Sequence, residues 1–139
     1  GQYFVGISPP SPTEDIARTM SMRHARTQAV QYLGETISSQ TTSTSGVVAG
    51  YVVNDNVVTT AAAGLASFVK DDRYCAAETQ ETPEGVKYVT RVLAFFPNEK
   101  KAEATVATID AVEKQMETDG KLTPEVKKDL AKLRLNAGK

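Results

Sequence analysis

Residues 12–40 read PTEDIARTMSMRHARTQAVQYLGETISSQ, and this stretch decides how the rest of the chain folds. Small and apolar residues recur in it at three- and four-residue spacing, which is the period of one helix face. Ser11 and Glu14 form a capping box around Pro12, which suits a first helical position. We therefore predict one long helix from Pro12 to Gln40, whose packing face is the row Met22, Ala25, Ala29, Leu33 and Ile37.

Three other segments have the composition of β-strands. Tyr3–Ile7 is short, aromatic and β-branched, and its odd-numbered residues share one face. Arg73–Glu81 and Val86–Phe96 flank Thr82-Pro83-Glu84-Gly85, a favourable turn, so we expect them to form a hairpin. The second half of Val86–Phe96 is continuously apolar, as expected of a strand that is covered on both faces.

The segment after the long helix allows two interpretations. Ser38–Gly46 is a polar break, either a mobile loop or a solvent-facing extension. In Val47–Val69 the β-branched residues favour two strands, Gly46–Val53 and Asn56–Ala61, around an Asn-Asp turn. We favour a helix from about Val52 to Val69, because its alanine-rich part is a poor strand.

Two more helices are predicted after the hairpin. Asn98 can cap a helix from Glu99 to about Asp119, which Gly120 ends, and Thr123-Pro124 starts a last helix. The predicted order is β-α-α-β-β-α-α. We expect an α+β fold whose three-stranded antiparallel sheet pairs the Val86–Phe96 strand with both others. The 139 residues suit a single domain, with a core of about 3–118 and the helix at about 124–137 as a possible appendage.

The composition excludes several classes of protein. Apolar residues make up 40% of the chain and charged residues 24%, which argues against global disorder. Sixteen basic and seventeen acidic side chains give a net charge of −1, whereas a nucleic-acid-binding protein needs a basic excess. Cys75 is the only cysteine, so no intrachain disulfide can form. It lies in the middle of a predicted strand, and we expect its side chain to be buried by packing against other residues. No segment is apolar enough to span a bilayer.

No catalytic, metal-binding or cofactor motif is present in the sequence. A single histidine, His24, cannot build a multi-histidine metal site, and we expect it to be structural or solvated. Cys75 has no activating base beside it in the sequence. The arginines at 18, 23 and 26 either bind an anionic group or lipid headgroup or form a solvated helix face; we favour the solvated face.

The pattern as a whole resembles a known family. It consists of the strand YFVGISPP, a helix carrying Ala17, Arg26, Ala29, Leu33 and Ile37, a Ser/Thr-rich exit, the strand YVTRVLAFF and a helical tail. In these features the chain resembles the twenty-kilodalton bacterial outer-membrane lipoprotein family and the related N-terminal domain of the flagellar assembly protein FlgT. The resemblance implies a dodecin-like sheet wrapped by helices and carries no catalytic residues.

The same resemblance implies an exported protein of the bacterial periplasm or outer membrane. Its relatives are often acylated on an N-terminal cysteine, which would lie upstream of Gly1 with a signal peptide that has been removed. The only link to the membrane would be that lipid anchor, and no nucleic acid is expected as a partner.

Our leading hypothesis is a non-enzymatic envelope protein that acts through contacts with other envelope proteins or with itself. The alternative is a small-ligand-binding module with an apolar pocket between the sheet and the helices. An enzyme is a third hypothesis, which requires His24 or Cys75 beside a carboxylate in a cleft. The candidate ligand or partner surface consists of Tyr51, Tyr88, Phe95, Phe96, Arg18 and Arg26.

Overall fold

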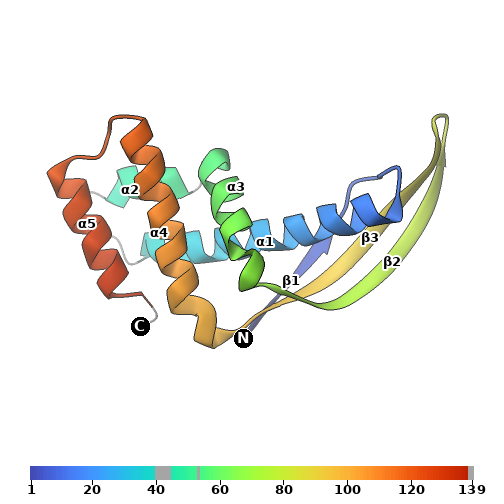
Figure 1. Ribbon diagram of the computed structural model, residues 1–139, viewed down its shortest axis with the longest axis horizontal. Helices are drawn as coiled ribbons and strands as arrows, with labels where there is room; N and C mark the ends of the chain where they lie inside the picture. The colour runs from blue at the N-terminus through green and yellow to red at the C-terminus, as the bar shows by residue number, and fades with distance from the viewer. Residues whose placement is uncertain (40–44, 53, 138–139) are drawn as a thin grey trace.

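A computed structural model describes residues 1–39, 45–52 and 54–137 of the chain. Figure 1 shows one long helix that runs from a three-stranded antiparallel sheet at one end into a group of helices at the other. The elements are β1 (Gln2–Ile7), α1 (Glu14–Ser39), α2 (Ser45–Val52), α3 (Asp55–Gly64), η1 (Leu65–Ser67), β2 (Lys70–Thr82), β3 (Gly85–Phe96), η2 (Asn98–Lys100), α4 (Lys101–Thr118) and α5 (Pro124–Leu135). The predicted α+β class with three antiparallel strands is confirmed.

The sheet has the predicted pairing. β3 is the central strand, and β1 and β2 pair with it in antiparallel fashion on its two sides. The register of β2 against β3 shifts between Asp71 and Arg73 and again between Ala76 and Glu78. Such bulges bend a strand and increase its twist. In Figure 1 the β2–β3 hairpin accordingly curves away, and its tip lies beyond the N-terminal end of α1.

Helix α1 covers one face of the sheet and comes very close to β1. Ala17, Ala25 and Ala29 on its inner face are at most 1% exposed. A Cβ atom added to Gly6 of β1 would lie 1.8 Å from the carbonyl oxygen of Ser21. Only glycine leaves room for this approach of two backbones. The predicted packing row of α1 is confirmed, because all five of its members are buried.

A buried polar seam lies beside this contact. The backbone N–H of Thr90 donates to Ser8 Oγ at 2.9 Å, and Thr90 Oγ1 donates to Ser21 Oγ at 3.0 Å. Ser21 Oγ in turn donates to the carbonyl of Arg18 at 2.9 Å. The seam joins β3, the end of β1 and α1. Its hydroxyls are all hydrogen-bonded, as burial requires.

Two predicted helix caps are wrong. Thr13, not Ser11, caps α1, because its hydroxyl accepts the backbone N–H of Ile16 at 3.2 Å. Ser11 is buried instead and pairs through its backbone with Tyr88. Because Ser11 is held in this bridge to β3, the first helical turn starts later than the capping-box pattern predicted. Asn98 lies within η2 and gives no side-chain cap.

The helix predicted for about 52–69 is confirmed over most of its length by α3 and η1, which together span 55–67, but its predicted start is wrong: a separate helix, α2, ends at Val52 before it. Asn54 lies between them in an extended conformation, and its side chain accepts the N–H of Asn56 at 3.0 Å. Such a side chain competes with helical hydrogen bonds and starts a new helix. The alternative of two strands is wrong as well. The predicted helix end at Gln40 and the middle of the polar break Ser38–Gly46 lie outside the described residues.

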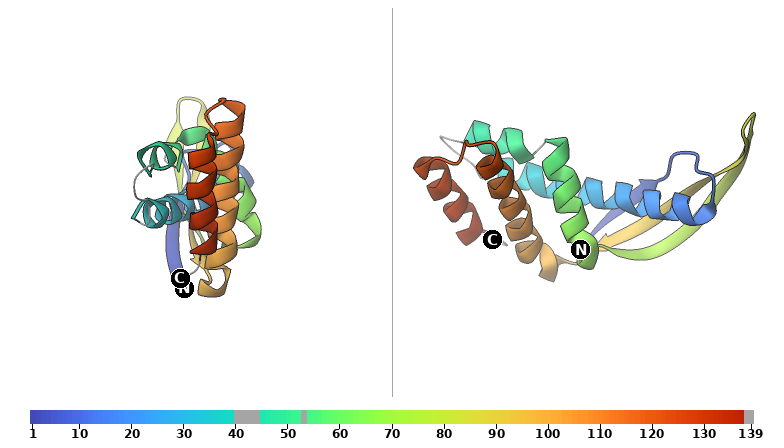
Figure 2. Two further views of the ribbon diagram at one scale, coloured as in Figure 1. Left: turned by 90° about the vertical axis from the view of Figure 1, so that its left-hand side faces the viewer. Right: turned by 45° about the horizontal axis from the view of Figure 1, so that its top comes forward.

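Two hydrophobic clusters fill the interior. The first lies between α1, the inner face of the sheet and α3, and the second lies at the other end of α1, between α2, α4 and α5. Figure 2 shows α4 and α5 side by side across that end of α1. The largest fully buried side chains include Val30, Leu33, Leu65 and Val92 in the first cluster, and Ile37, Ile109, Met116 and Leu130 in the second.

Replacing Gly6 tests the close contact of α1 and β1. Gly6→Ala should lower the free energy of unfolding by about 1–3 kcal/mol or more, because the new methyl group meets backbone and not a flexible side chain. Gly64→Ala is the matched control: its Cβ has nothing within 4 Å and its backbone is helical, so the change should be neutral or stabilise by up to about 1 kcal/mol. Equal stability of the two variants in urea denaturation would contradict the contact.

Candidate functional site

The face of the sheet opposite α1 is open to solvent. Tyr3, Val5 and Ile7 of β1 point to this face and are 52%, 49% and 42% exposed. Phe4, which points to α1, is 8% exposed. Among the described residues, α1 is the one helix that packs extensively on the sheet. The prediction that both faces of β3 are covered is therefore wrong.

The open face is ordered in three rows that cross the sheet from β2 through β3 to β1. The rows follow from the strand register and are Lys70–Phe95–Tyr3, Arg73–Leu93–Val5 and Cys75–Arg91–Ile7. In every row the β1 residue is aromatic or aliphatic. In two of the three rows the β2 residue has a basic side chain. We call these nine residues the open sheet face. Tyr3 and Phe95 stack on it, with ring centroids 4.9 Å apart.

Cys75 belongs to this face and is exposed, so the prediction that it packs inside the fold is wrong. Its neighbour across the strand pair is Arg91, which is exposed too. The strand β2 is an edge strand whose outer face no helix covers, and this explains the exposure. No carboxylate lies within ion-pair distance of Arg73 or Arg91 in the described part of the chain.

The opposite side of β2 carries a polar cluster that fastens it to the start of α1. The Tyr74 hydroxyl donates to Glu14 Oε1 at 2.7 Å, and the Arg18 guanidinium carbon lies 4.3 Å from the centre of the Tyr74 ring. Arg18 also pairs with Asp71 at 3.1 Å. The hydrogen bond to Glu14, with burial and the negative charge of Glu14, raises the pKa of Tyr74 to about 12.

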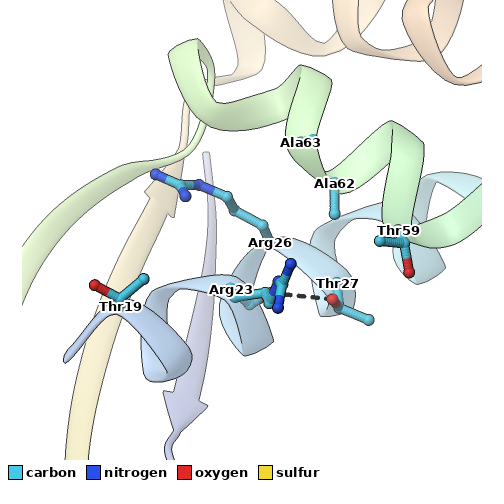
Figure 3. A pocket seen from close by; sticks show the side chains of 7 residues that line it. All are labelled: Thr19, Arg23, Arg26, Thr27, Thr59, Ala62 and Ala63. Atoms are coloured by element: carbon cyan, nitrogen blue, oxygen red, sulfur yellow. Dashed lines mark hydrogen bonds between the residues drawn. The ribbon is translucent and has the colours of Figure 1, made fainter. Parts of the chain in front are cut away.

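The second arginine of the predicted surface, Arg26, lies elsewhere. It lines a groove between α1 and α3, together with Arg23 and several threonines (Figure 3). An adjoining groove shares Arg26 and also reaches Arg18 and Lys70. Neither groove is lined by any of the four predicted aromatic residues.

Those aromatic residues are not brought together. The Tyr51 hydroxyl donates to Asp119 at 2.7 Å at the far end of α1, a hydrogen bond that raises the pKa of Tyr51. Phe96 is buried in the first cluster, and Tyr88 pairs with Ser11. Of the four, Phe95 alone belongs to the open sheet face. An apolar pocket shared by the four is therefore not formed.

His24 has a structural contact, in agreement with the sequence analysis. Its Nδ1 accepts the backbone N–H of Ile7 at 3.0 Å, and its other ring nitrogen lies 3.4 Å from the amide nitrogen of Gln28. Gln28 also donates to the carbonyl of Val5 at 2.6 Å. These bonds tie the exposed edge of β1 to α1. Across the described residues, no three His, Cys, Asp or Glu side chains are grouped to hold a metal ion.

Comparisons with known proteins give no relative: no family model, curated protein or solved structure matches the chain. None of the helices in the described part of the chain combines the length and hydropathy that crossing a membrane requires.

Most of the open sheet face was not predicted from the sequence. The alternation in β1 places Tyr3, Val5 and Ile7 on one side of a strand but does not indicate that this side is uncovered. One residue in the sequence, Arg91, does indicate that this face of the sheet is uncovered. It interrupts the most apolar strand at a position that shares a face with Leu93, and a charged side chain is rarely fully buried without a partner.

The pKa of Tyr74 gives a test of the cluster at the start of α1. Its phenol should ionise near pH 12, later than the ordinary value near 10, and Glu14→Gln should return it toward that value. Because the neutral phenol is the favoured form, its contribution to stability is complete below pH 10 and is lost as the pH rises through 12. Tyrosinate absorbance, with Tyr74→Phe to identify the signal, measures this. Ionisation of Tyr74 together with an ordinary exposed tyrosine would contradict the hydrogen bond.

Proposed function

We propose that this protein is a non-enzymatic binding protein that acts through protein–protein contacts, with the open sheet face as its docking surface. The observation that carries the proposal is the exposure of Tyr3, Val5 and Ile7 beside Leu93 and Phe95. Soluble proteins seldom leave contiguous apolar surface uncovered, and where they do, the surface usually binds a partner.

The charges on the open sheet face define the chemistry of the partner. Lys70 and Arg73 form a basic margin on β2, and Arg91 lies between Cys75 and Ile7. The face holds no acidic residue in its three rows. A partner with an apolar strip flanked by carboxylates would complement both features.

The same charges disfavour docking of two open sheet faces against each other. A second copy would bring another basic margin and no carboxylate within the three rows, so the bases would stay unpaired or repel. We therefore propose a different protein as the partner, and self-association is the outcome that contradicts this choice.

The cellular setting rests on the family resemblance. We propose that the protein is exported to the bacterial periplasm or outer membrane, that its partners are other envelope proteins, and that any membrane attachment is through a lipid anchor upstream of Gly1. We propose neither catalysis nor nucleic-acid binding. We do not favour the alternative of an apolar ligand pocket between the sheet and the helices, since the aromatic residues expected to line it lie apart.

Site-specific photo-crosslinking in cells of the source organism tests the docking surface. A benzoylphenylalanine placed at Ile7 should give a discrete adduct with another protein, and Val5→Glu should reduce its yield. A reduction of roughly tenfold corresponds to about 1.4 kcal/mol of interface energy. The matched control is the same photoreactive group at Leu135, which is 78% exposed on α5, far from the sheet.

Three outcomes would contradict the proposal. Equal adducts from positions 7 and 135 would show that the face has no preference for a partner. Adducts of only twice the mass of the chain would indicate self-association. A hydrolytic or transfer activity that one substitution abolishes would replace the non-enzymatic assignment.

A further inference from the structure

A groove of about 540 Å³ lies between α1 and α3, on the helical side of the molecule and away from the open sheet face. Its walls are Arg23, Arg26 and two threonines of α1, facing Thr59 and two alanines of α3 (Figure 3). The α1 residues repeat at three- and four-residue spacing, so they lie along one side of that helix. The lining contains two cationic side chains and no acidic one: Thr19, Arg23, Arg26, Thr27, Thr59, Ala62 and Ala63.

The two arginines of the groove are unpaired, like Arg73 and Arg91 and unlike Arg18 and Arg134. Arg18 pairs with Asp71, and Arg134 binds both Asp110 and Glu113. In the described part of the chain, no carboxylate lies within ion-pair distance of Arg23 or Arg26. Two neighbouring cations, a helical turn apart, thus concentrate positive charge in a chain whose net charge is −1.

One polar atom of Arg26 is buried. Its Nε atom is buried and has no hydrogen-bond partner among the described residues. A buried donor without a partner costs free energy, and such atoms are rare in folded proteins. In Figure 3 the Arg26 side chain extends along the groove below the end of α3. Because protein atoms cover Nε, a ligand in the groove would be held by the terminal guanidinium nitrogens of Arg26.

Hydroxyl groups add to the donors. The hydroxyls of Thr19 and Thr59 are exposed in the lining of the groove and have no hydrogen-bond partner among the described residues. Thr27 donates to the carbonyl of Arg23 at 3.0 Å, which leaves its oxygen as an acceptor only. On the α3 side of the groove, Ala62 and Ala63 have small side chains that leave space for a ligand. The groove therefore offers guanidinium and hydroxyl donors around a space without large apolar side chains.

We infer that this groove is a binding site for a phosphate group, held by the Arg23 and Arg26 guanidiniums. A guanidinium matches phosphate oxygens with parallel, charge-assisted hydrogen bonds, and two arginines match a dianion. The lining has no aromatic side chain on which a base or ring would stack. Recognition therefore rests on the phosphate, whether it is free, part of a small molecule, or on a lipid headgroup.

The adjoining groove extends the site along α1. It is lined by Arg26, Thr19 and Lys70, and also by Arg18 and Asp71, which neutralise each other. Lys70 is the additional free charge there, with no carboxylate within ion-pair distance in the described part of the chain. A phosphate bound at Arg26 would thus have a third cation on its far side.

Titration with inorganic phosphate at constant ionic strength tests the inference, with sodium chloride as the reference salt. Phosphate should shift the guanidinium NMR signals of Arg23 and Arg26 in a saturable way. Arg26→Gln and Arg23→Gln should each weaken binding about tenfold or more, as expected for the loss of one charge-assisted hydrogen bond. Arg91→Gln is the matched control, because Arg91 is also exposed and unpaired but lies on the open sheet face; binding should stay unchanged.

A lipid source is distinguished with vesicles. Sedimentation with phosphatidylcholine vesicles containing phosphatidic acid, compared with phosphatidylcholine alone, should retain the protein through Arg23 and Arg26 if a headgroup is the ligand. Saturable binding of inorganic phosphate without retention would support a soluble ligand. Binding of neither probe, or equal effects of the variants at 23, 26 and 91 in variants with native thermal stability, would overturn the inference.

Discussion

The contact between the backbones of α1 and β1 is the constraint on which the rest of the structure depends. It exists because Gly6 has no side chain and because the facing residues of α1 are Ser21 and Ala25. A helix held this close packs along β1 and β3 and touches β2 only at a few positions. The buried hydroxyls of Ser8, Ser21 and Thr90 then fix its position along the strands.

Two surfaces with different chemistry follow from this arrangement. One long helix can cover one face of a three-stranded sheet, and the remaining helices pack on the far part of α1, so the other face keeps its apolar residues in solvent. Where α3 crosses α1, the small side chains of Ala62 and Ala63 leave a groove beside Arg23 and Arg26. Lys70 belongs to the open sheet face and also lines the groove that adjoins the inferred phosphate site, so the proposed protein partner and a phosphate would meet at this residue.

The features of the fold that depend on interactions between residues close in the sequence were predicted correctly. The row of Ala25, Ala29 and Leu33, the hairpin and the strand order are confirmed, because periodicity and turn chemistry determine them. Helix α2, which precedes Asn54, was missed because the β-branched residues of this segment favour strands locally. The candidate sites depend on long-range packing. Nothing near Arg23 in the sequence indicates that Thr59 lies opposite it, and alternation within β1 shows which residues share a face but not whether that face is covered.

Thiol accessibility tests most directly the central claim that α1 seals one face of the sheet and leaves the other open. The native Cys75 should react with iodoacetamide in the folded protein nearly as fast as in urea, because it belongs to the open sheet face. In a Cys75→Ala background, Val92→Cys should stay unmodified until the protein unfolds, since Val92 is 1% exposed beneath α1. Protection of Cys75 in the isolated protein, or rapid modification at position 92, would contradict the account.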